Sequence, residues 1–591
     1  MVRTTVSPLN ITTCFSEPLL SQEIWSTTRE QPYPHPGENV RLHYDRARSL
    51  CKAAGLSIAD IRDLSPRFWQ FHFDRKDKPP RNSQQLMVTV ISARDMTAFI
   101  IATIHLNLCI GTIASFAAGR PDLSALLDDL LCFKTCGEFM LTELGHGLDA
   151  RNLETTATLL PNGCFDLDSP GESAWKAMPP TTPQCGMPRV AVVFARLIVD
   201  SNDRGIKPFI VKLCSAQHMC QGITSRVLPT RLGTKPLDHA ITSFHHVLLP
   251  PGALLGSTCK PDDARLDFSS QIWRVSVGTL SLSIMGVSAI NLASNIALTY
   301  SRRRVTSAGS SGERIPILQF STQKRPIVKG LVSSIILKAF ANWTIDQFMS
   351  PTLVGDVRRA IATVFKATVM KQARVLTELS ERCGWQGLYA FNQISELLST
   401  FLGNTVAEGD TLVLCIRLAS ELLGNKYTLP EPRDPTMPLA VLEKGLFEEA
   451  RRRVQALGGY EEHRKTSFDK HILPRSRALI EAVGSRMAYE AARDDGTHPA
   501  VLRLYECESM GADLSWFTEH TSMSRGSFFD SISAAYEDAF PVVQTAADFD
   551  NVDKYITAPI RSEESWSEFM GTLHSFEPTL CHTALTLSSK L

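Results

Sequence analysis

An uncharged segment, Val275 to Tyr300, restricts the fold of this chain more than any other feature. It reads VSVGTLSLSIMGVSAINLASNIALTY, with serine and asparagine scattered among apolar residues. By length it could cross a membrane as a helix. The polar interruptions favour a helix buried on all sides in a large bundle, because small and polar side chains suit close helix contacts. The segment Thr97 to Gly119, with His105 and Asn107 in its apolar run, is interpreted in the same way. We therefore expect a large helical bundle and no membrane span.

The periodicity of apolar residues changes along the chain and predicts helical and β-rich regions in turn. The pattern is helical from Asn39 to Phe139. Short β-branched and aromatic segments, bounded by turn residues, follow from Thr142 to Gly256 and predict strands, at 190–200, 207–213 and 241–250. Long helices return from Ile272 to Leu423, and a proline-rich joint at Tyr427 to Pro438 precedes further helical sequence.

At 591 residues the chain is too long for one simple core and should divide into several domains. We expect an α+β fold. Its expected parts are an N-terminal helical domain (1–140), a central β-barrel-like domain (141–264), a helical bundle (265–428) and a second, C-terminal helical domain (429–591).

Charge and cysteine content argue against two classes of site. Lys plus Arg total 61 and Asp plus Glu total 61, so no net positive field favours a nucleic-acid partner. The 14 cysteines form no CxxC pair and no Cys/His spacing typical of zinc. We expect neither a nucleic-acid partner nor a metal site.

The last three residues are Ser589, Lys590 and Leu591. An SKL carboxyl terminus is an address read by the peroxisomal import receptor. We therefore expect peroxisomal localisation.

The segment TELGHGLDARNLETTAT, Thr142 to Thr158, combines two glycines, a histidine and a run of small hydroxyl residues. Glycine allows a close approach that a side chain would prevent, and threonine favours extended structure. Two interpretations fit these residues. The segment is a tight turn before a strand, with no ligand, or its backbone approaches a bound molecule.

A second segment, NTVAEGDTLVL, runs from Asn404 to Leu414. Glu408-Gly409-Asp410 can be the acidic start of a helix, since the helix dipole favours carboxylates there. Glu408 can also be a general base, because a carboxylate in an apolar pocket has the raised pKa that proton abstraction requires.

These segments, in this order, resemble the acyl-CoA oxidases within the acyl-CoA dehydrogenase superfamily. TELGHG and LETTAT match the family's segments, and residues 165–180, FDLDSPGESAWKAMPP, resemble its next strand and Ser-Pro turn. Further matches are GIKPFIVKL, GITSRVLPTRLG, YSRRRVTS, ILQFSTQ, CGWQGL and VAEGDT. The resemblance extends from about Phe71 to Leu423, and the second helical domain is typical of the oxidase branch.

The resemblance implies an FAD-dependent acyl-CoA oxidase. Such an enzyme converts an acyl-CoA into a trans-2-enoyl-CoA and passes electrons to molecular oxygen, giving hydrogen peroxide. Glu408 aligns with the family's catalytic glutamate, which removes the α-proton, and its backbone N–H with a donor to the thioester oxygen. Gly409 would let the backbone approach the thioester, and Ala407 and Leu148 would line the substrate site.

The resemblance also implies cofactor contacts. Thr142 would contact the flavin, and Gly145 and Gly147 would bring the backbone close to it. Arg302 takes the place of an arginine that reaches FAD across a homodimer. Gln323, Gly384 and Gly387 complete the set of expected cofactor residues, while His146 is interpreted as part of the turn.

The chain departs from the family's pattern around the expected ligand site. Ala407 stands where an aromatic residue is usual, Leu148 replaces Ser or Thr, and Ala177, Met178 and Pro180 replace two tryptophans and a glycine. These changes predict an unusual acyl group: branched, unsaturated or polyketide-type. Two alternatives stay open: a related flavoenzyme of a specialised biosynthetic pathway with another acceptor or reaction, and a catalytically degenerate paralogue that acts as a binding protein.

Overall fold

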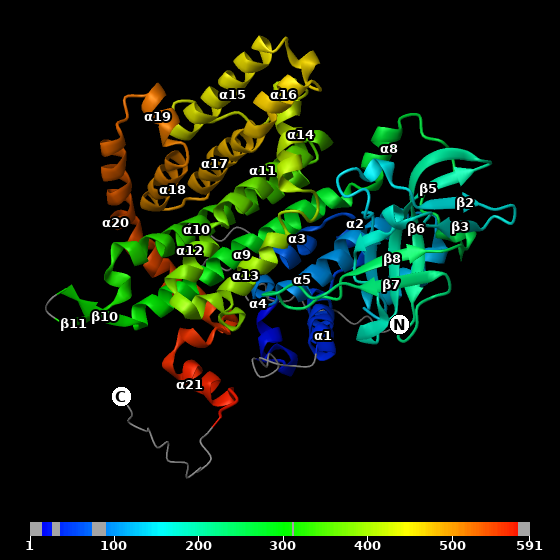
Figure 1. Ribbon diagram of the computed structural model, residues 1–591, viewed down its shortest axis with the longest axis horizontal. Coiled ribbons are helices and arrows are strands. Elements are labelled where there is room, and N and C mark those ends of the chain that lie inside the picture. Colours follow the sequence, from blue (N-terminus) through cyan, green and yellow to red (C-terminus); the bar gives the residue numbers. More distant parts are fainter. Residues whose placement is uncertain (1–14, 27–35, 74–89, 310–311, 577–591) are drawn as a thin grey trace, which may run out of the picture.

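The computed structural model describes residues 15–26, 36–73, 90–309 and 312–576 (Figure 1). It combines helical domains with a curled β-domain, which confirms the α+β expectation. The carboxyl-terminal Ser589, Lys590 and Leu591 lie outside the described residues.

The N-terminal helices pack between the β-domain and the central bundle, in blue in Figure 1. They are α1 (Pro36–Ala54), α2 (Ile58–Arg62), α3 (Pro66–His72), α4 (Ile91–Arg94), α5 (Met96–Thr103), the π-helix η4 (Ile104–Ile110), α6 (Gly111–Ser115) and α7 (Ser124–Leu131). The α5–η4–α6 stretch covers the apolar segment expected to be a buried helix. Both it and α9 are long and apolar enough to span a membrane by length and composition, and 89% of each apolar window is buried in the fold.

The β-domain contains two packed sheets at one end of the molecule (Figure 1). The larger sheet has the order β1-β5-β2-β3-β9, with β6 on the other side of β5, and the smaller has the order β4-β8-β7. Their strands are β1 (Cys136–Met140), β2 (Thr156–Leu159), β3 (Phe165–Asp168), β4 (Lys176–Met178), β5 (Arg189–Val199), β6 (Asn202–Cys214), β7 (Ile223–Val227), β8 (Ala240–Phe244) and β9 (Val247–Leu249).

The predicted strands at 190–200 and 207–213 are confirmed as β5 and β6, and the segment 241–250 forms β8 and β9. The expectation of helix up to Phe139 is wrong at its end, because β1 occupies 136–140. The β-domain therefore starts before LETTAT, whose last three residues begin β2. Every residue of β1 is buried, so this strand lacks the alternating pattern that marks a half-buried strand.

Most of the helical bundle and the C-terminal helices occupy the other side of the molecule, whereas α8 lies beside the β-domain (Figure 1). The bundle contains α8 (Ala264–Gln271), α9 (Arg274–Arg303), the hairpin β10 (Val305–Ala308) and β11 (Glu313–Pro316), α10 (Ser321–Met349), α11 (Gly355–Gln372), α12 (Val375–Arg382), the 3₁₀-helix η12 (Gly384–Leu388), α13 (Ile394–Gly403) and α14 (Thr411–Leu423). The C-terminal helices are α15 (Pro438–Ala456), α16 (Thr466–His471), α17 (Ser476–Asp494), α18 (Pro499–Gly511), α19 (Leu514–His520), α20 (Arg525–Phe549) and α21 (Glu563–Thr572).

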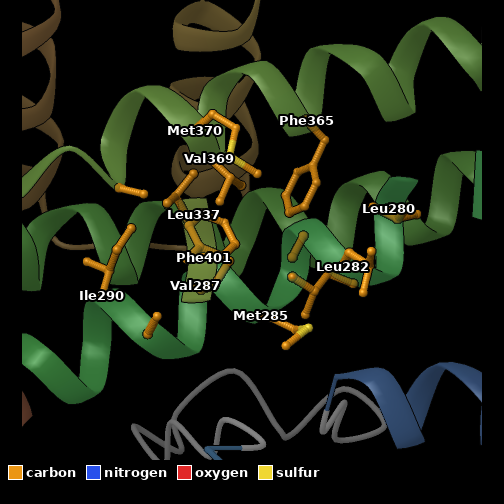
Figure 2. Close-up of a cluster of buried hydrophobic side chains, with 14 of the residues drawn as sticks. Leu280, Leu282, Met285, Val287, Ile290, Leu337, Phe365, Val369, Met370 and Phe401 are labelled. Atoms are coloured by element: carbon orange, nitrogen blue, oxygen red, sulfur yellow. The ribbon is translucent and has the colours of Figure 1, made fainter. Parts of the chain in front are cut away.

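Helix α9 forms the centre of the bundle core. Figure 2 shows its apolar side chains packed against residues of α10, α11 and α13, including Phe365 and Phe401. Gly286 allows this approach, because a Cβ there would lie 2.3 Å from the Phe401 ring. Two serines of α9 bond within the helix: Ser283 and Ser294 donate to carbonyl oxygens one turn earlier, at 2.6 and 2.7 Å. Such bonds let a buried helix accommodate these two serines.

Candidate active site

A cavity of about 980 Å³ lies where the β-domain, the N-terminal helices and the bundle meet. Its apolar wall includes Ile100, Ile104 and Leu108, which share one face of the α5–η4 stretch. A volume of this order suits a large organic ligand. The cavity brings together six residues predicted from the sequence: Thr142, Gly147, Leu148, Ala407, Glu408 and Gly409. Ala177, Met178 and Pro180, the sites of departure from the family pattern, line it as well.

The loop that carries Glu408 joins α13 to α14 and is held at both ends. Thr411 donates from its backbone and its hydroxyl to the carbonyl oxygen of Thr405, at 2.9 and 2.7 Å. Asp410 caps α14, accepting from the backbone of Val413 at 3.0 Å. Between these anchors Glu408 adopts a φ of +53°. Because side chains other than glycine rarely adopt this conformation, the loop must supply the energy that maintains it.

The side chain of Glu408 packs against the start of α9. A Cβ added at Gly278 would lie 2.7 Å from the carboxyl carbon of Glu408, so the absence of a side chain there makes room for the carboxylate. The next residue of the helix fixes the backbone of Glu408, because the hydroxyl of Thr279 donates to the Glu408 carbonyl at 2.8 Å. Helix α9 thus places both the carboxylate and its peptide.

Lys366 of α11 holds the same loop by its backbone. Its ammonium group donates to the carbonyl oxygens of Ala407 and Gly409, at 2.6 Å each. Burial raises the pKa of Glu408 to about 8, against the lowering effect of the nearby Lys366 charge. Burial also lowers the pKa of Lys366 to about 8, opposed by Glu408. Glu408 is half-buried, and a raised pKa of this kind suits a base for a weakly acidic C–H.

Most of the TELGHG segment stabilises the β-domain. Glu143 accepts from Lys176 at 2.9 Å and from the backbone of Glu154 and Thr155, at 2.7 and 3.0 Å. His146 pairs with the Glu154 carboxylate at 3.1 Å, which agrees with its interpretation as a turn residue. The predicted ligand side of the segment consists of Thr142, Gly147 and Leu148, which line the cavity.

Gly145 has a structural explanation of its own. A Cβ at this position would lie 2.9 Å from Ser173, so the glycine allows two segments of the β-domain to meet. At Gly147 an added Cβ would meet no atom within 4 Å, and this backbone is open toward the cavity.

The other predicted cofactor residues form a second cluster at the far end of α9. Gln323 donates to the hydroxyl of Ser301 at 2.8 Å and to the carbonyl of Arg382 at 2.7 Å, and so joins the neighbourhoods of Arg302 and Gly384. Arg302 lies 23 residues after Thr279 on one helix, or about 35 Å at a rise of 1.5 Å per residue. The two clusters of one chain are therefore well separated.

Within the second cluster, Arg302 Nη1 pairs with Asp548 at 2.7 Å, while its buried Nη2 has no hydrogen-bond partner among the described residues. Gly384 has a φ of +60°, and an added Cβ would meet no atom within 4 Å. Gly387 instead packs closely on the Ser380 carbonyl, 2.0 Å from an ideal Cβ.

Residues that sequence reasoning missed support the site from behind. Lys366 interrupts an apolar helix as a buried charge, and this was a signal that the sequence offered. Gly278 lies inside the long helix α9, where glycine is unfavourable without a packing reason. Glu138 of β1, a buried carboxyl group in the cavity wall, was also missed.

Comparisons with known proteins bear on this geometry. The family model described as "Acyl-CoA oxidase, C-alpha1 domain" matches residues 280–423. The chain is 22% identical over 409 residues to peroxisomal acyl-coenzyme A oxidase 2 of Arabidopsis thaliana, covering 65% of this chain and 58% of that protein. It is 25% identical over 339 residues to human peroxisomal acyl-coenzyme A oxidase 3, covering 53% of this chain and 48% of the relative. The matches thus span about half the length of these curated relatives.

Solved structures show the same fold over nearly the whole chain. Acyl-CoA oxidase 1 of Yarrowia lipolytica matches with a TM-score of 0.74 and 17% identity, over 94% of this chain and 89% of that one. Acyl-CoA oxidase-2 of Caenorhabditis elegans matches with a TM-score of 0.68 and 16% identity, over 91% and 92%. The chain therefore resembles the acyl-CoA oxidases in sequence, most specifically over residues 280–423, and shares their fold.

Proposed function

We propose that the protein is an FAD-dependent acyl-CoA oxidase with Glu408 as its general base. The observation that carries this proposal is the Glu408 carboxylate, fixed by α9 and Lys366 in the wall of a large, mainly apolar cavity. An α-proton beside a thioester is only weakly acidic, so its removal needs a desolvated base of raised pKa in a fixed position. Relatives that are named peroxisomal acyl-CoA oxidases support this assignment.

The loop also offers a group that can stabilise charge on the thioester oxygen. The backbone N–H of Glu408 makes no hydrogen bond to another described residue. A free N–H beside the base can donate to the oxygen that gains negative charge as the proton leaves. Gly409, with a φ of +91°, continues the loop without a side chain that would obstruct the thioester.

The residues present fit FAD as cofactor. Two acyl-CoA oxidase structures from C. elegans contain bound FAD. In this chain Thr142 offers a hydroxyl to the cavity, the Gly147 backbone is open toward it, and Arg302 Nη2 is a buried donor without a partner among the described residues. When bound, FAD supplies the acceptor for the hydride that leaves the β-carbon.

The separation of the two clusters supports a homodimer. We propose that Thr142 and Gly147 serve the flavin end of the cofactor, with Gly145 shaping the turn between them. Arg302, Gln323, Gly384 and Gly387 would serve the FAD of a second copy. A guanidinium group suits this role because it makes charge-assisted bonds to phosphate oxygens. Arg359 and Arg417, which also line the cavity, supply positive charge for the phosphates of CoA.

We propose molecular oxygen as electron acceptor and the peroxisome as location. The overall reaction then converts acyl-CoA and oxygen into trans-2-enoyl-CoA and hydrogen peroxide. The SKL terminus and the peroxisomal relatives support this setting, where an import receptor would read Ser589 to Leu591. Peroxide release separates an oxidase from the alternative flavoenzyme with another acceptor.

We further propose that the acyl group is branched, unsaturated or polyketide-type. Ala407, Ala177 and Met178 line the cavity where the family has aromatic side chains, and smaller side chains leave more room for a ligand. Met178, in the same wall, adopts a φ of +80°, an uncommon conformation for a side chain of its size.

The deciding experiment compares the parent with Glu408→Gln under anaerobic conditions, with acyl-CoA added and flavin bleaching followed. The amide keeps the shape of the side chain but cannot accept a proton, so bleaching should slow at least about a hundredfold while FAD stays bound. Glu421→Gln is the matched control, because Glu421 also lines the cavity but is paired with Tyr427 and Arg417. Near-parent bleaching in Glu408→Gln would refute the assignment. A protein that binds no flavin would favour the degenerate paralogue.

A further inference from the structure

One part of the cavity wall is polar and lies outside the catalytic loop. It is formed by Thr97, Glu138, Lys235 and Thr400. Three of them belong to one bonded cluster, because Lys235 pairs with Glu396 at 2.9 Å and Thr400 donates to the same carboxylate at 3.1 Å. Thr97 completes the cluster by donating to the Lys235 carbonyl at 3.2 Å. The polar atoms of these side chains therefore have partners within the protein.

Glu138 differs from its neighbours in this wall. It is 2% exposed, and its Oε1 accepts from Arg189 at 2.8 Å. Glu138 lines the cavity, and its other oxygen, Oε2, is buried with no hydrogen-bond partner among the described residues. Leaving a buried acceptor unsatisfied costs about 1–3 kcal/mol, and more for a charged group. A ligand that bonds to this oxygen removes that cost.

The ion pair with Arg189 does not explain the unpaired oxygen. Arg189 also donates to Asp238 at 3.0 Å, to the Tyr44 hydroxyl at 2.8 Å and to the carbonyls of Pro180 and Thr182, at 2.9 and 2.7 Å. The guanidinium is thus neutralised and satisfied on several sides. Asp238, by contrast, uses both of its oxygens within the protein, accepting from Tyr44 and Thr182.

We propose that Glu138 is a ligand-recognition residue, whose Oε2 pairs with an O–H or N–H group on the molecule that fills the cavity. The inference rests on the proposed function, in which two groups could donate to Oε2. One is a hydroxyl on the acyl group, and the other is the imide N–H of FAD. Burial and the Asp238 charge raise the pKa of Glu138 to about 8, against the Arg189 charge. A hydroxyl pairs with either form of the carboxyl group, since it both donates and accepts.

The test uses Glu138→Met, which keeps the approximate volume but removes the polar atoms, with Asp238→Asn as matched control. The control perturbs the same Arg189 network without changing a residue of the cavity wall. Two readouts are measured in each protein: the affinity for FAD, and the thermal stabilisation given by acyl-CoAs of equal length with and without a hydroxyl. Neither readout requires turnover, so each can be read even if the oxidase assignment fails.

An acyl hydroxyl as partner predicts that Glu138→Met loses about tenfold in affinity for hydroxyacyl-CoA relative to plain acyl-CoA, with FAD affinity unchanged. The FAD imide as partner predicts a similar loss for FAD and no change between the two acyl-CoAs. For Asp238→Asn, the FAD affinity and the ratio of affinities for the two acyl-CoAs should each stay within about twofold of the parent. Equal effects of the two variants on every readout would overturn the proposal. If Glu138→Met does not fold, Glu138→Asp takes its place and is judged by the same outcomes. This variant keeps the charge beside Arg189 but withdraws the carboxyl group from the cavity.

Discussion

The ammonium group of Lys366 fixes the backbone on both sides of Glu408. It bonds to the carbonyl oxygens of the preceding and the following residue, each at 2.6 Å. One side chain of α11 therefore holds the base in its left-handed conformation and also places a positive charge near its carboxylate. These two roles, positioning and electrostatic, can be separated by experiment.

Lys366→Met should slow flavin reduction at least about tenfold, because small displacements of a catalytic group have large effects on rate. Loss of the positive charge should also raise the pKa of Glu408, so the acidic limb of kcat/KM should move to higher pH. Lys371→Met is the control, since Lys371 lies on the same helix but donates to Ser485. A lower rate with an unmoved pH profile would limit Lys366 to a structural role.

Gly278→Ala should displace the base without touching it chemically. The added methyl group would lie 2.7 Å from the Glu408 carboxyl carbon, so the side chain must move. We expect flavin reduction to slow at least about tenfold, with FAD binding retained. Ser276→Ala, a change of similar size on the cavity-facing start of α9, should have little effect. Equal rates for the parent and Gly278→Ala would mean that the carboxylate acts from another position.

Glu408→Gln should become more stable than the parent as pH rises. The folded-state pKa of Glu408 is about 8, above its ordinary value, so its contribution to stability is complete at low pH and is lost as pH rises towards 8. The glutamine side chain of Glu408→Gln does not ionise, so the variant does not lose stability in this way. One pKa unit corresponds to about 1.4 kcal/mol, and partial exposure to the cavity reduces the full effect, so we expect a gain of at least about 1 kcal/mol at pH 8.

Unfolding midpoints of the two proteins between pH 5 and pH 8 check this expectation. For Glu421→Gln the difference from the parent should be flat over this range. Burial raises the pKa of Glu421, but the Tyr427 hydrogen bond and the Arg417 charge leave it below its ordinary value, so this group stays ionised throughout. A constant difference for Glu408→Gln as well would show that its carboxylate is solvated.

The sequence was sufficient to predict the buried helix α9, because an uncharged segment of that length leaves few alternatives. It did not reveal β1, whose short, uniformly buried sequence lacks a strand period. Glu408 was identified by resemblance to a family motif. Lys366 and Gly278 were not, since their roles depend on contacts with residues that lie 41 to 130 positions along the chain. A lysine within an apolar run and a glycine within a helix were local signals, but which residues they contact is a property of the tertiary fold.

Arg302→Ala should weaken FAD retention more than it weakens the fold. Its Nη2 is buried without a partner among the described residues, and a guanidinium–phosphate bond is charge-assisted. Arg303→Ala is the neighbouring control, because Arg303 is bound within its own chain to Glu563 and to the Ile560 carbonyl. FAD content after gel filtration and the molar mass of the eluted protein are the measurements. A monomer that retains FAD fully would contradict both the role of Arg302 and the proposed dimer.

Ala407→Phe should change the choice of substrate more than the rate. Ala407 lines the cavity directly beside the base, and a phenyl ring there would occupy space that a bulky acyl group needs. Straight short chains should be spared or helped, because filling empty apolar space regains contacts. The measurement is the ratio of flavin-reduction rates for a branched and a straight acyl-CoA, in parent and variant. A displaced Glu408 would slow both substrates together and leave this ratio unchanged. An unchanged ratio would therefore remove the main support for a bulky or branched substrate, whatever happened to the rate itself.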